Sequence, residues 1–302
     1  MIMTFKSNIQ FIKNSNKFLL LSITVFIVSV FLIFLKGIKK SIDFKGGTII
    51  NLTIESDKYD LSILRDVLSN KLTNSINVVE MKTELNDYEV VVTTEYLSNE
   101  SQVSDVLKSL YNDSYKINKI ESIGPKIGKE LSKNARNAII ASLILIGLYI
   151  SIRFDFSYAV GSIAALLHDL IITLGVFVVV DYEISVAIIA ALLTIVGYSL
   201  NDTIVIYDRI RENLTNNPHR TKDQTINESL NQTLARTVVT SLTTLLVVMV
   251  LFLYGGNVLK PFAFTLIVGV LLGTYSSLFV ASPIMLYLEE KFNLEVEEKE
   301  NI

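Results

Sequence analysis

Six long apolar stretches decide what this chain can fold into. The chain has 302 residues, of which 50% are hydrophobic and only 19% are charged, and its mean hydropathy is +0.47. Soluble domains average roughly 25% charged residues, and about 20 mostly apolar residues are enough to cross the hydrocarbon layer of a membrane. The sequence therefore predicts an α-helical polytopic membrane protein with six transmembrane helices, at residues 18–36, 137–152, 156–180, 184–206, 237–254 and 262–288.

Composition excludes several kinds of function. The chain has no cysteine, and its two histidines are His168 and His219. This excludes disulfide frameworks, thiol nucleophiles and zinc sites built from Cys and His. A net charge of −3 and a pI of about 5.6 give no electrostatic footprint for nucleic acid. We therefore expect a protein that is not an enzyme, with no catalytic residues, no metal and no cofactor.

The short connections indicate how the helices are oriented, because cytoplasmic loops carry an excess of Lys and Arg. Loop 207–236 is the most basic connection, with Arg209, Arg211, Arg220, Lys222 and Arg236. We expect residues 1–17 and the tail 289–302 in the cytoplasm, and residues 37–136 on the outer side. No small-residue cleavage site follows the first apolar run, so we interpret that run as an uncleaved anchor.

Residues 37–136 have the charge content of a soluble domain, and their periodicity indicates alternating strands and helices. Strand patterns cover 48–54, 76–81, 88–94 and 115–123, with a turn at Asn86-Asp87 between the second and third, and helical spacing covers 61–72 and 103–110. The order βαββαβ predicts a ferredoxin-like α+β domain. No nucleotide-binding or catalytic motif is present in it, which favours a binding or mechanical module. Gly124-Pro125 is interpreted as part of a turn that leads into the second span.

The candidate functional residues lie inside the membrane, where ionisable side chains are costly and usually mark a pathway. Across the six runs there are two acids, Asp169 and Asp202, and one histidine, His168. Asp202 lies about 10 Å from the cytoplasmic Arg209, at a rise of about 1.5 Å per residue. Arg236 lies at the cytoplasmic start of the fifth run, at a similar depth, and is long enough to reach inward.

Asp202 and Arg236 together suggest a proton carrier. Burial favours a neutral carboxyl group whereas a nearby guanidinium favours the carboxylate, so Asp202 beside Arg236 can switch between the two forms. A static buried ion pair is the alternative. His168-Asp169 fits either a relay or a satisfied polar pair, and Asn201 and Thr240 fit either a water wire or ordinary interhelical hydrogen bonds.

Two patterns concern helix packing. Gly269 and Gly273 form a GxxxG pair that predicts close approach of another helix, from this chain or from a partner. Ile226, Leu230 and Leu234 form a short apolar stripe in the basic loop, which we expect to lie on the membrane surface.

Five motifs, in order along residues 18–288, carry a resemblance to a known family. They are Asp43-Phe-Lys-Gly-Gly-Thr48, Glu121-Ser-Ile-Gly-Pro125, Leu167-His-Asp169, Gly197-Tyr-Ser-Leu-Asn-Asp-Thr203 running into Tyr207-Asp-Arg-Ile-Arg-Glu-Asn213, and Ala235-Arg-Thr-Val-Val-Thr-Ser-Leu-Thr-Thr244. The sequence closely resembles the SecF family of bacterial translocase subunits, within the resistance-nodulation-division superfamily of proton-driven transporters.

The resemblance implies a role in protein export across the bacterial cytoplasmic (inner) membrane. SecF-like proteins pair with SecD, associate with the SecYEG channel and use the proton gradient to help complete translocation of a preprotein after the ATPase SecA has acted. YajC and YidC are further candidate partners of this accessory subunit. Asp202 and Arg236 match the proton-pathway positions of the family. The proton is then the coupling ion.

Other classes of protein remain open. One is a half-size proton-driven exporter of lipids or small molecules. Another is an intramembrane aspartyl protease that uses Asp169 and Asp202, although Asp202 lacks the Gly-x-Gly-Asp setting of such enzymes. A purely scaffolding role is a third.

Overall fold

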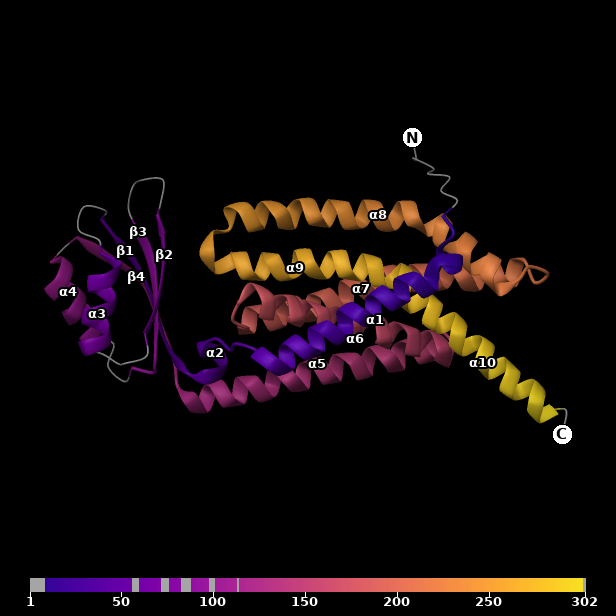
Figure 1. Ribbon diagram of the computed structural model, residues 1–302, viewed down its shortest axis with the longest axis horizontal. Helices are drawn as coiled ribbons and strands as arrows, with labels where there is room; N and C mark the ends of the chain where they lie inside the picture. The colour runs from indigo at the N-terminus through magenta and orange to yellow at the C-terminus, as the bar shows by residue number, and fades with distance from the viewer. Residues whose placement is uncertain are drawn as a thin grey trace. The chain divides into compact units, whose positions relative to one another are not determined.

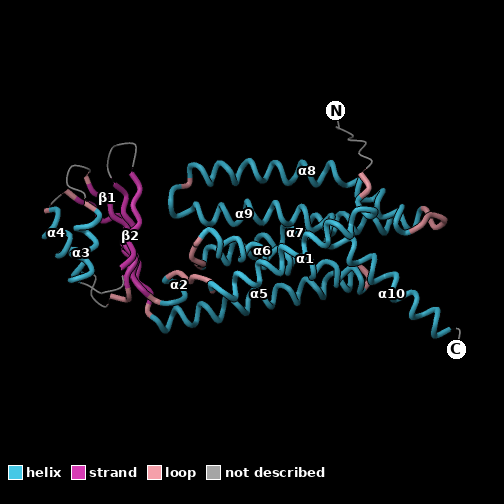
Figure 2. Tube along the Cα trace, in the orientation of Figure 1, coloured by secondary structure: helices cyan, strands magenta, loops and turns pink. Residues whose placement is uncertain are grey.

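The structure, a computed structural model, describes residues 9–55, 60–71, 76–82, 88–97, 101–112 and 114–300. The chain divides into two compact units (Figures 1 and 2). One unit runs from Lys40 to Arg136, and the other combines Met1–Lys39 with Asn137–Ile302.

The Lys40–Arg136 unit is a four-stranded antiparallel sheet covered by two helices. Its elements are β1 Gly47–Ile54, α3 Leu61–Lys71, β2 Ile76–Lys82, β3 Tyr88–Thr94, α4 Ser101–Tyr111 and β4 Tyr115–Ile123. The strand order is β2-β3-β1-β4. Alternate side chains of the strands, such as Ile50 and Leu52, pack with Leu64 of α3 and Leu107 of α4 in one core. The strands and helices lie where the periodicity predicts them, while the Asn86-Asp87 turn and Leu72 lie outside the described residues.

A glycine pair connects the sheet to the chain before it. The short helix α2, Ile42–Lys45, ends at Gly46, whose φ is +82°, and Gly47 follows with φ +155°. A Cβ on Gly46 would lie 2.8 Å from the Cα of Pro125, and one on Gly47 would lie 2.7 Å from the carbonyl oxygen of Thr94. Only glycine tolerates both this backbone conformation and this close approach.

The other unit is a helical bundle, and six helices of the described chain are long and apolar enough to cross a membrane, of which α5 begins within the first unit. They are α1 Phe11–Lys36, α5 Pro125–Arg153, α6 Phe156–Val180, α7 Val186–Asn216, α8 Lys222–Tyr254, and a last span formed by α9 Gly256–Ser276, the π-helix η2 Ser277–Ala281 and α10 Ser282–Glu300. Residues 1–8 of the predicted cytoplasmic N-terminus lie outside the described residues.

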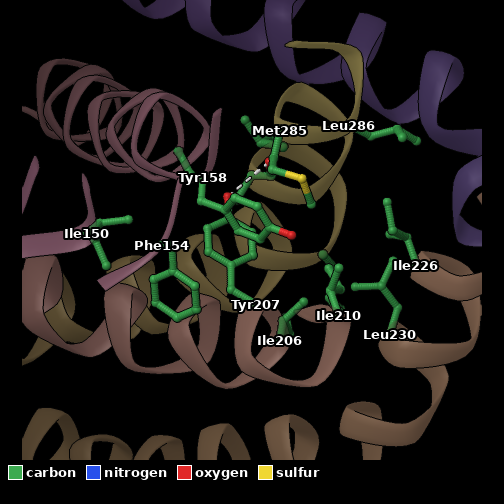
Figure 3. Packing of buried hydrophobic residues seen from close by; sticks show 14 of the residues in the cluster. Ile150, Phe154, Tyr158, Ile206, Tyr207, Ile210, Ile226, Leu230, Met285 and Leu286 are labelled. Atoms are coloured by element: carbon green, nitrogen blue, oxygen red, sulfur yellow. Dashed lines mark hydrogen bonds between the residues drawn. The ribbon is translucent and has the colours of Figure 1, made fainter. Parts of the chain in front are cut away.

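Several helices extend well beyond the predicted apolar runs. The second begins at Pro125 instead of residue 137, so only Gly124 remains of the predicted turn; proline is favoured at the first helical position because its missing N–H is unneeded there. Helix α8 begins at Lys222 and so includes the apolar stripe that starts at Ile226. The prediction that this stripe lies on the membrane surface is wrong. Ile226 and Leu230 are fully buried in the core of the bundle (Figure 3). Hydropathy marks only the part of a helix that needs an apolar surrounding, so it missed these polar extensions.

Burial separates a central set of helices from a peripheral set. About half of the apolar window is buried in α6 (56%), α7 (44%) and the last span (50%), against 11% in α1, 6% in α5 and 17% in α8. The peripheral helices expose large apolar side chains, as a lipid surrounding requires. The candidate site lies where the central helices meet.

Candidate functional site

Asp169 of α6 lies at the centre of a hydrogen-bonded cluster formed by three helices. The residue is only 1% exposed. Its Oδ1 is 2.9 Å from Nδ1 of His168, and its Oδ2 accepts hydrogen bonds from the hydroxyls of Ser199 in α7 at 2.8 Å and Ser276 in α9 at 2.7 Å. Buried carboxylates require such donors, because an uncompensated charge in an apolar interior is very costly.

The glycine pair of α9 allows this cluster to form. A Cβ on Gly269 would lie 2.1 Å from the side chain of Ile195, and a Cβ on Gly273 would lie 2.9 Å from the Cβ of Ser199. The helix that approaches the GxxxG pair is therefore α7 of the same chain. Because Ser276 follows Gly273 by about one turn, the close contact brings Ser199 and Ser276 together at Asp169.

The last span changes its winding directly after Ser276. Residues Ser277–Ala281 form the π-helix η2, and such insertions are frequent at functional sites. The hydroxyl of the fully buried Tyr207 donates to the carbonyl oxygen of Ala281 at 3.2 Å. Tyr207 also packs edge-on against Tyr158, with 4.8 Å between ring centroids (Figure 3). This contact holds α6, α7 and η2 together on one side of the Asp169 cluster.

His168 connects the cluster to α1. Its ring stacks on that of Tyr275, with 6.3 Å between centroids, and the Tyr275 hydroxyl donates to the carbonyl oxygen of Phe18 and accepts from Ser22. Nε2 of His168 is buried and has no hydrogen-bond partner. One ring nitrogen is therefore engaged by Asp169 while the other is free.

Asp202 has different surroundings. It is 3% exposed, and its Oδ2 has no hydrogen-bond partner. The charge of Arg236 acts on Asp202 electrostatically, but among the described residues no ion pair joins the two. The direct pair that the sequence suggests is thus not formed, because Asp202 faces the bundle interior while Arg236 is exposed on the peripheral helix α8.

Helix α7 joins the two acids. Ser199 binds Asp169, and Asp202 follows it by three residues on the same helix. The Thr203 hydroxyl donates to the carbonyl oxygen of Ser199 at 3.2 Å. A shift of this helix would therefore alter the surroundings of both carboxyl groups.

Asn201 and Thr240 are the other two residues that the sequence suggests for a proton pathway. Asn201 is exposed, and the Thr240 hydroxyl donates to the carbonyl oxygen of Arg236 at 3.0 Å, which is a bond within its own helix. The sequence analysis did not identify Ser199 and Ser276 as partners of Asp169. The available signal was that both serines are small residues and that Ser276 lies one turn after Gly273 of the GxxxG pair. Among the residues that the structure describes, no three acidic or histidine side chains group as a metal site requires.

Two families of known proteins match this chain. The family described as "Protein export membrane protein SecD/SecF, C-terminal" matches residues 102–291, and the "SecD/SecF GG Motif" matches residues 31–58, which include Gly46 and Gly47. A protein of Calditerrivibrio nitroreducens named protein translocase subunit SecF is 38% identical to this chain, over 91% of this chain and 92% of the relative. A protein of the same name from Vibrio alginolyticus is 39% identical, over 95% of this chain and 92% of the relative.

A solved structure has the same fold. SecDF of Thermus thermophilus, described as a translocon-associated membrane protein, matches 96% of this chain with a TM-score of 0.84 and 36% identity. The chain spans only about 40% of the length of that protein.

Six apolar helices, three of which meet at the buried Asp169, define a multi-pass membrane protein. The chain belongs to the SecD/SecF protein export family, in which its full-length relatives are SecF subunits of the protein translocase.

Proposed function

We propose that this chain is the SecF-type subunit of a bacterial Sec translocase, which works with SecD and SecYEG after the SecA step; YajC and YidC are further candidate partners. The SecF names of its relatives support this role, and the match to part of a SecDF chain supports SecD as the partner that supplies the rest. The membrane is the cytoplasmic one, with both termini inside. Residues 37–136, whose strand order matches a ferredoxin-like fold, form the outer domain that engages the preprotein.

The coupling ion is the proton, and Asp202 carries it without a bound cofactor. The observation that supports this assignment is the buried Asp202 carboxyl group, with an unpartnered oxygen and the charge of Arg236 acting on it. Protonation removes the attraction between them, and deprotonation restores it. Because α7 also carries Ser199, this change is passed to the Asp169 cluster and to the helices packed against it.

The energies limit how many protons the cycle needs. One charge that crosses 100 mV provides about 2.3 kcal/mol. Moving a two-state equilibrium from 1:99 to 99:1 requires about 5.5 kcal/mol. A single proton at this potential therefore biases a conformational change, and a pH gradient or further protons complete it.

Two other functions receive less support. A half-size exporter would act without a SecD-type half, whereas the chain aligns with part of a SecDF protein. An aspartyl protease needs two carboxyl groups that share a proton, whereas Asp169 is bound by His168, Ser199 and Ser276.

The role of Asp202 can be tested by complementation of cells depleted of their own SecF. Asp202→Asn removes the exchangeable proton and should strongly slow export at wild-type protein levels. Glu212→Gln is the matched control, because Glu212 is an exposed acid of the same helix that pairs with Arg209 on the surface; it should retain export. Full export by Asp202→Asn would contradict the proposal.

A further inference from the structure

The chain leaves the bundle through residues 37–39, the exit segment, which follows α1 and precedes the Lys40–Arg136 unit. Gly37 has φ +71°, and no described atom lies within 4 Å of a Cβ built on it. Glycine gives the backbone its widest choice of conformations, so an unattached exit segment would absorb small movements of the helices. Lys39, however, is attached to the turn between α6 and α7.

Lys39 makes two contacts with that turn. The amide of Ile184 donates a 2.8 Å hydrogen bond to the carbonyl oxygen of Lys39, and the Lys39 ammonium group donates to Oδ2 of Asp181 at 2.6 Å. Asp181 directly follows the last residue of α6, where the partial negative charge of the helix end also favours a cation. We call these two contacts of Lys39 the exit clamp. Because they hold its main chain as well as its side chain, the clamp does not depend on the exposed ion pair alone, which contributes little.

The turn is itself fixed to the helices on both sides of it. Asp181 has φ +61°, a left-handed conformation that Asp adopts more readily than most residues, and its amide donates to the carbonyl oxygen of Phe177. Tyr182 packs edge-on against Phe264 of α9, with 5.4 Å between ring centroids. Ile184 is buried, and α7 begins two residues after it. The turn therefore has to follow any displacement of α6 and α7.

The Lys40–Arg136 unit is connected to the bundle by two stretches of chain. One is α5, a continuous helix whose apolar part is only 6% buried. The other is the exit segment, whose clamp belongs to the helices that carry Asp169 and Asp202. We propose that the exit clamp transmits displacements of α6 and α7 to the Lys40–Arg136 unit. This inference rests on the proposed function, in which a proton at Asp202 drives export and the outer domain engages the preprotein.

Two insertions separate attachment from transmission. A Gly-Gly pair between Lys39 and Lys40 leaves the clamp in place but adds up to about 7 Å of flexible chain beyond it. The same pair between Gly37 and Ile38 adds the same length before the clamp and is the matched control. Both variants are tested as full chains with their native partners in inside-out vesicles. The readout is the acceleration of preprotein translocation by a proton gradient.

The insertion beyond the clamp should lose most of that acceleration, whereas the control insertion should keep it. Translocation without the gradient should be equally slow in both variants and in the wild type, because the clamp acts only on the gradient-driven part. Equal acceleration in the two insertion variants would overturn the proposal. A wild type that the gradient does not accelerate would contradict the proposed function as well, so the two failures are distinguishable.

Substitutions in the clamp test it without changing the length of the chain. Lys39→Gln and Asp181→Asn each remove the ion pair, and Asn keeps the tolerance for the left-handed conformation. Each should lose part of the acceleration, and the double variant should lose no more than the weaker single variant, because both changes remove one shared contact. Lys40→Gln, at the adjacent exposed lysine, is the control and should keep the acceleration. Additive losses would count against the clamp.

Hydrogen exchange of the Ile184 amide tests the clamp independently of export. The bond to the carbonyl oxygen of Lys39 should protect this amide in the wild type and in both insertion variants, which also shows that the variants keep the clamp. Exchange in the wild type as fast as that of an exposed amide would overturn the proposal.

Discussion

The hydroxyl of Ser199 donates a 2.8 Å hydrogen bond to Oδ2 of Asp169, and so ties α7 to the buried acid of α6. Asp202 lies on α7 less than one turn further along. Helix α7, which carries Asp202 and binds Asp169 through Ser199, therefore connects the two buried acids mechanically, although their carboxyl groups have different partners.

Removal of the serine donors should destabilise the bundle more than additively. Hydrogen bonds between transmembrane helices contribute about 0.6 kcal/mol on average and up to about 1.7, so Ser199→Ala and Ser276→Ala should each cost about 1 kcal/mol. The double variant leaves Oδ2 of Asp169 without a donor and should cost more than the sum. Thermal unfolding of the wild type, the two single variants and the double variant in detergent gives the coupling free energy between Ser199 and Ser276.

Ser282→Ala is the control for that cycle. Ser282 is fully buried, but its hydroxyl binds the carbonyl oxygen of Ser277 in its own span. Its loss should leave the coupling between Ser199 and Ser276 unchanged. A strictly additive double variant would show that the two serines do not share Asp169.

Gly273→Ala should separate α9 from α7. The new Cβ would lie 2.9 Å from the Cβ of Ser199, and overpacking of this kind costs about 1–3 kcal/mol. Gly197→Ala on α7 is the control, because no atom lies within 4 Å of a Cβ built there, and it should be neutral or stabilising. Equal melting temperatures for the two variants would contradict the close contact.

Arg236→Gln should reduce export strongly, because the positive charge that acts on Asp202 is lost. Arg236→Lys keeps the charge and should retain part of the activity. Arg220→Gln removes a cation that pairs with Glu228 on the surface, and it should have little effect. Pulse-labelled preprotein export measures all three, and equal export by the Gln and Lys variants would argue against an electrostatic role.

Acid should loosen the start of α3. Oδ1 of Asp60 accepts hydrogen bonds from the Ser62 hydroxyl at 2.6 Å and from the amides of Ser62 and Ile63, and these bonds lower the pKa of Asp60. A lowered pKa in the folded state gives stability that is present above the pKa of the unfolded chain and is lost as the pH falls through the folded value. Hydrogen exchange of the α3 amides, corrected for the intrinsic rate, should therefore rise between neutral pH and about pH 3.

Asp60→Asn should reduce this pH dependence, whereas Asp66→Asn, at an exposed position in the same helix, should not. The same pH dependence in Asp60→Asn as in the wild type would show that titration of Asp60 is not its cause.

The sequence predicts six spans and the order of strands and helices because each depends on local periodicity. Hydropathy locates the apolar part of each helix, so the polar extensions at Pro125 and Lys222 were missed. The acids at 169 and 202 are evident from sequence because charge is rare in membranes. The partners of Asp169 are not evident, because Ser199 and Ser276 meet it through the contact of Gly273 with α7.

The role proposed for Asp202 is tested most directly in inside-out vesicles that carry the translocase with this chain and a preprotein arrested late in transit. The time to complete translocation is measured with and without a proton gradient, for the wild type and for Asp202→Asn. The wild type should finish faster when the gradient is present, and Asp202→Asn should finish at one slow rate in both conditions. The same acceleration by the gradient in Asp202→Asn would contradict the proposal that Asp202 carries the coupling proton.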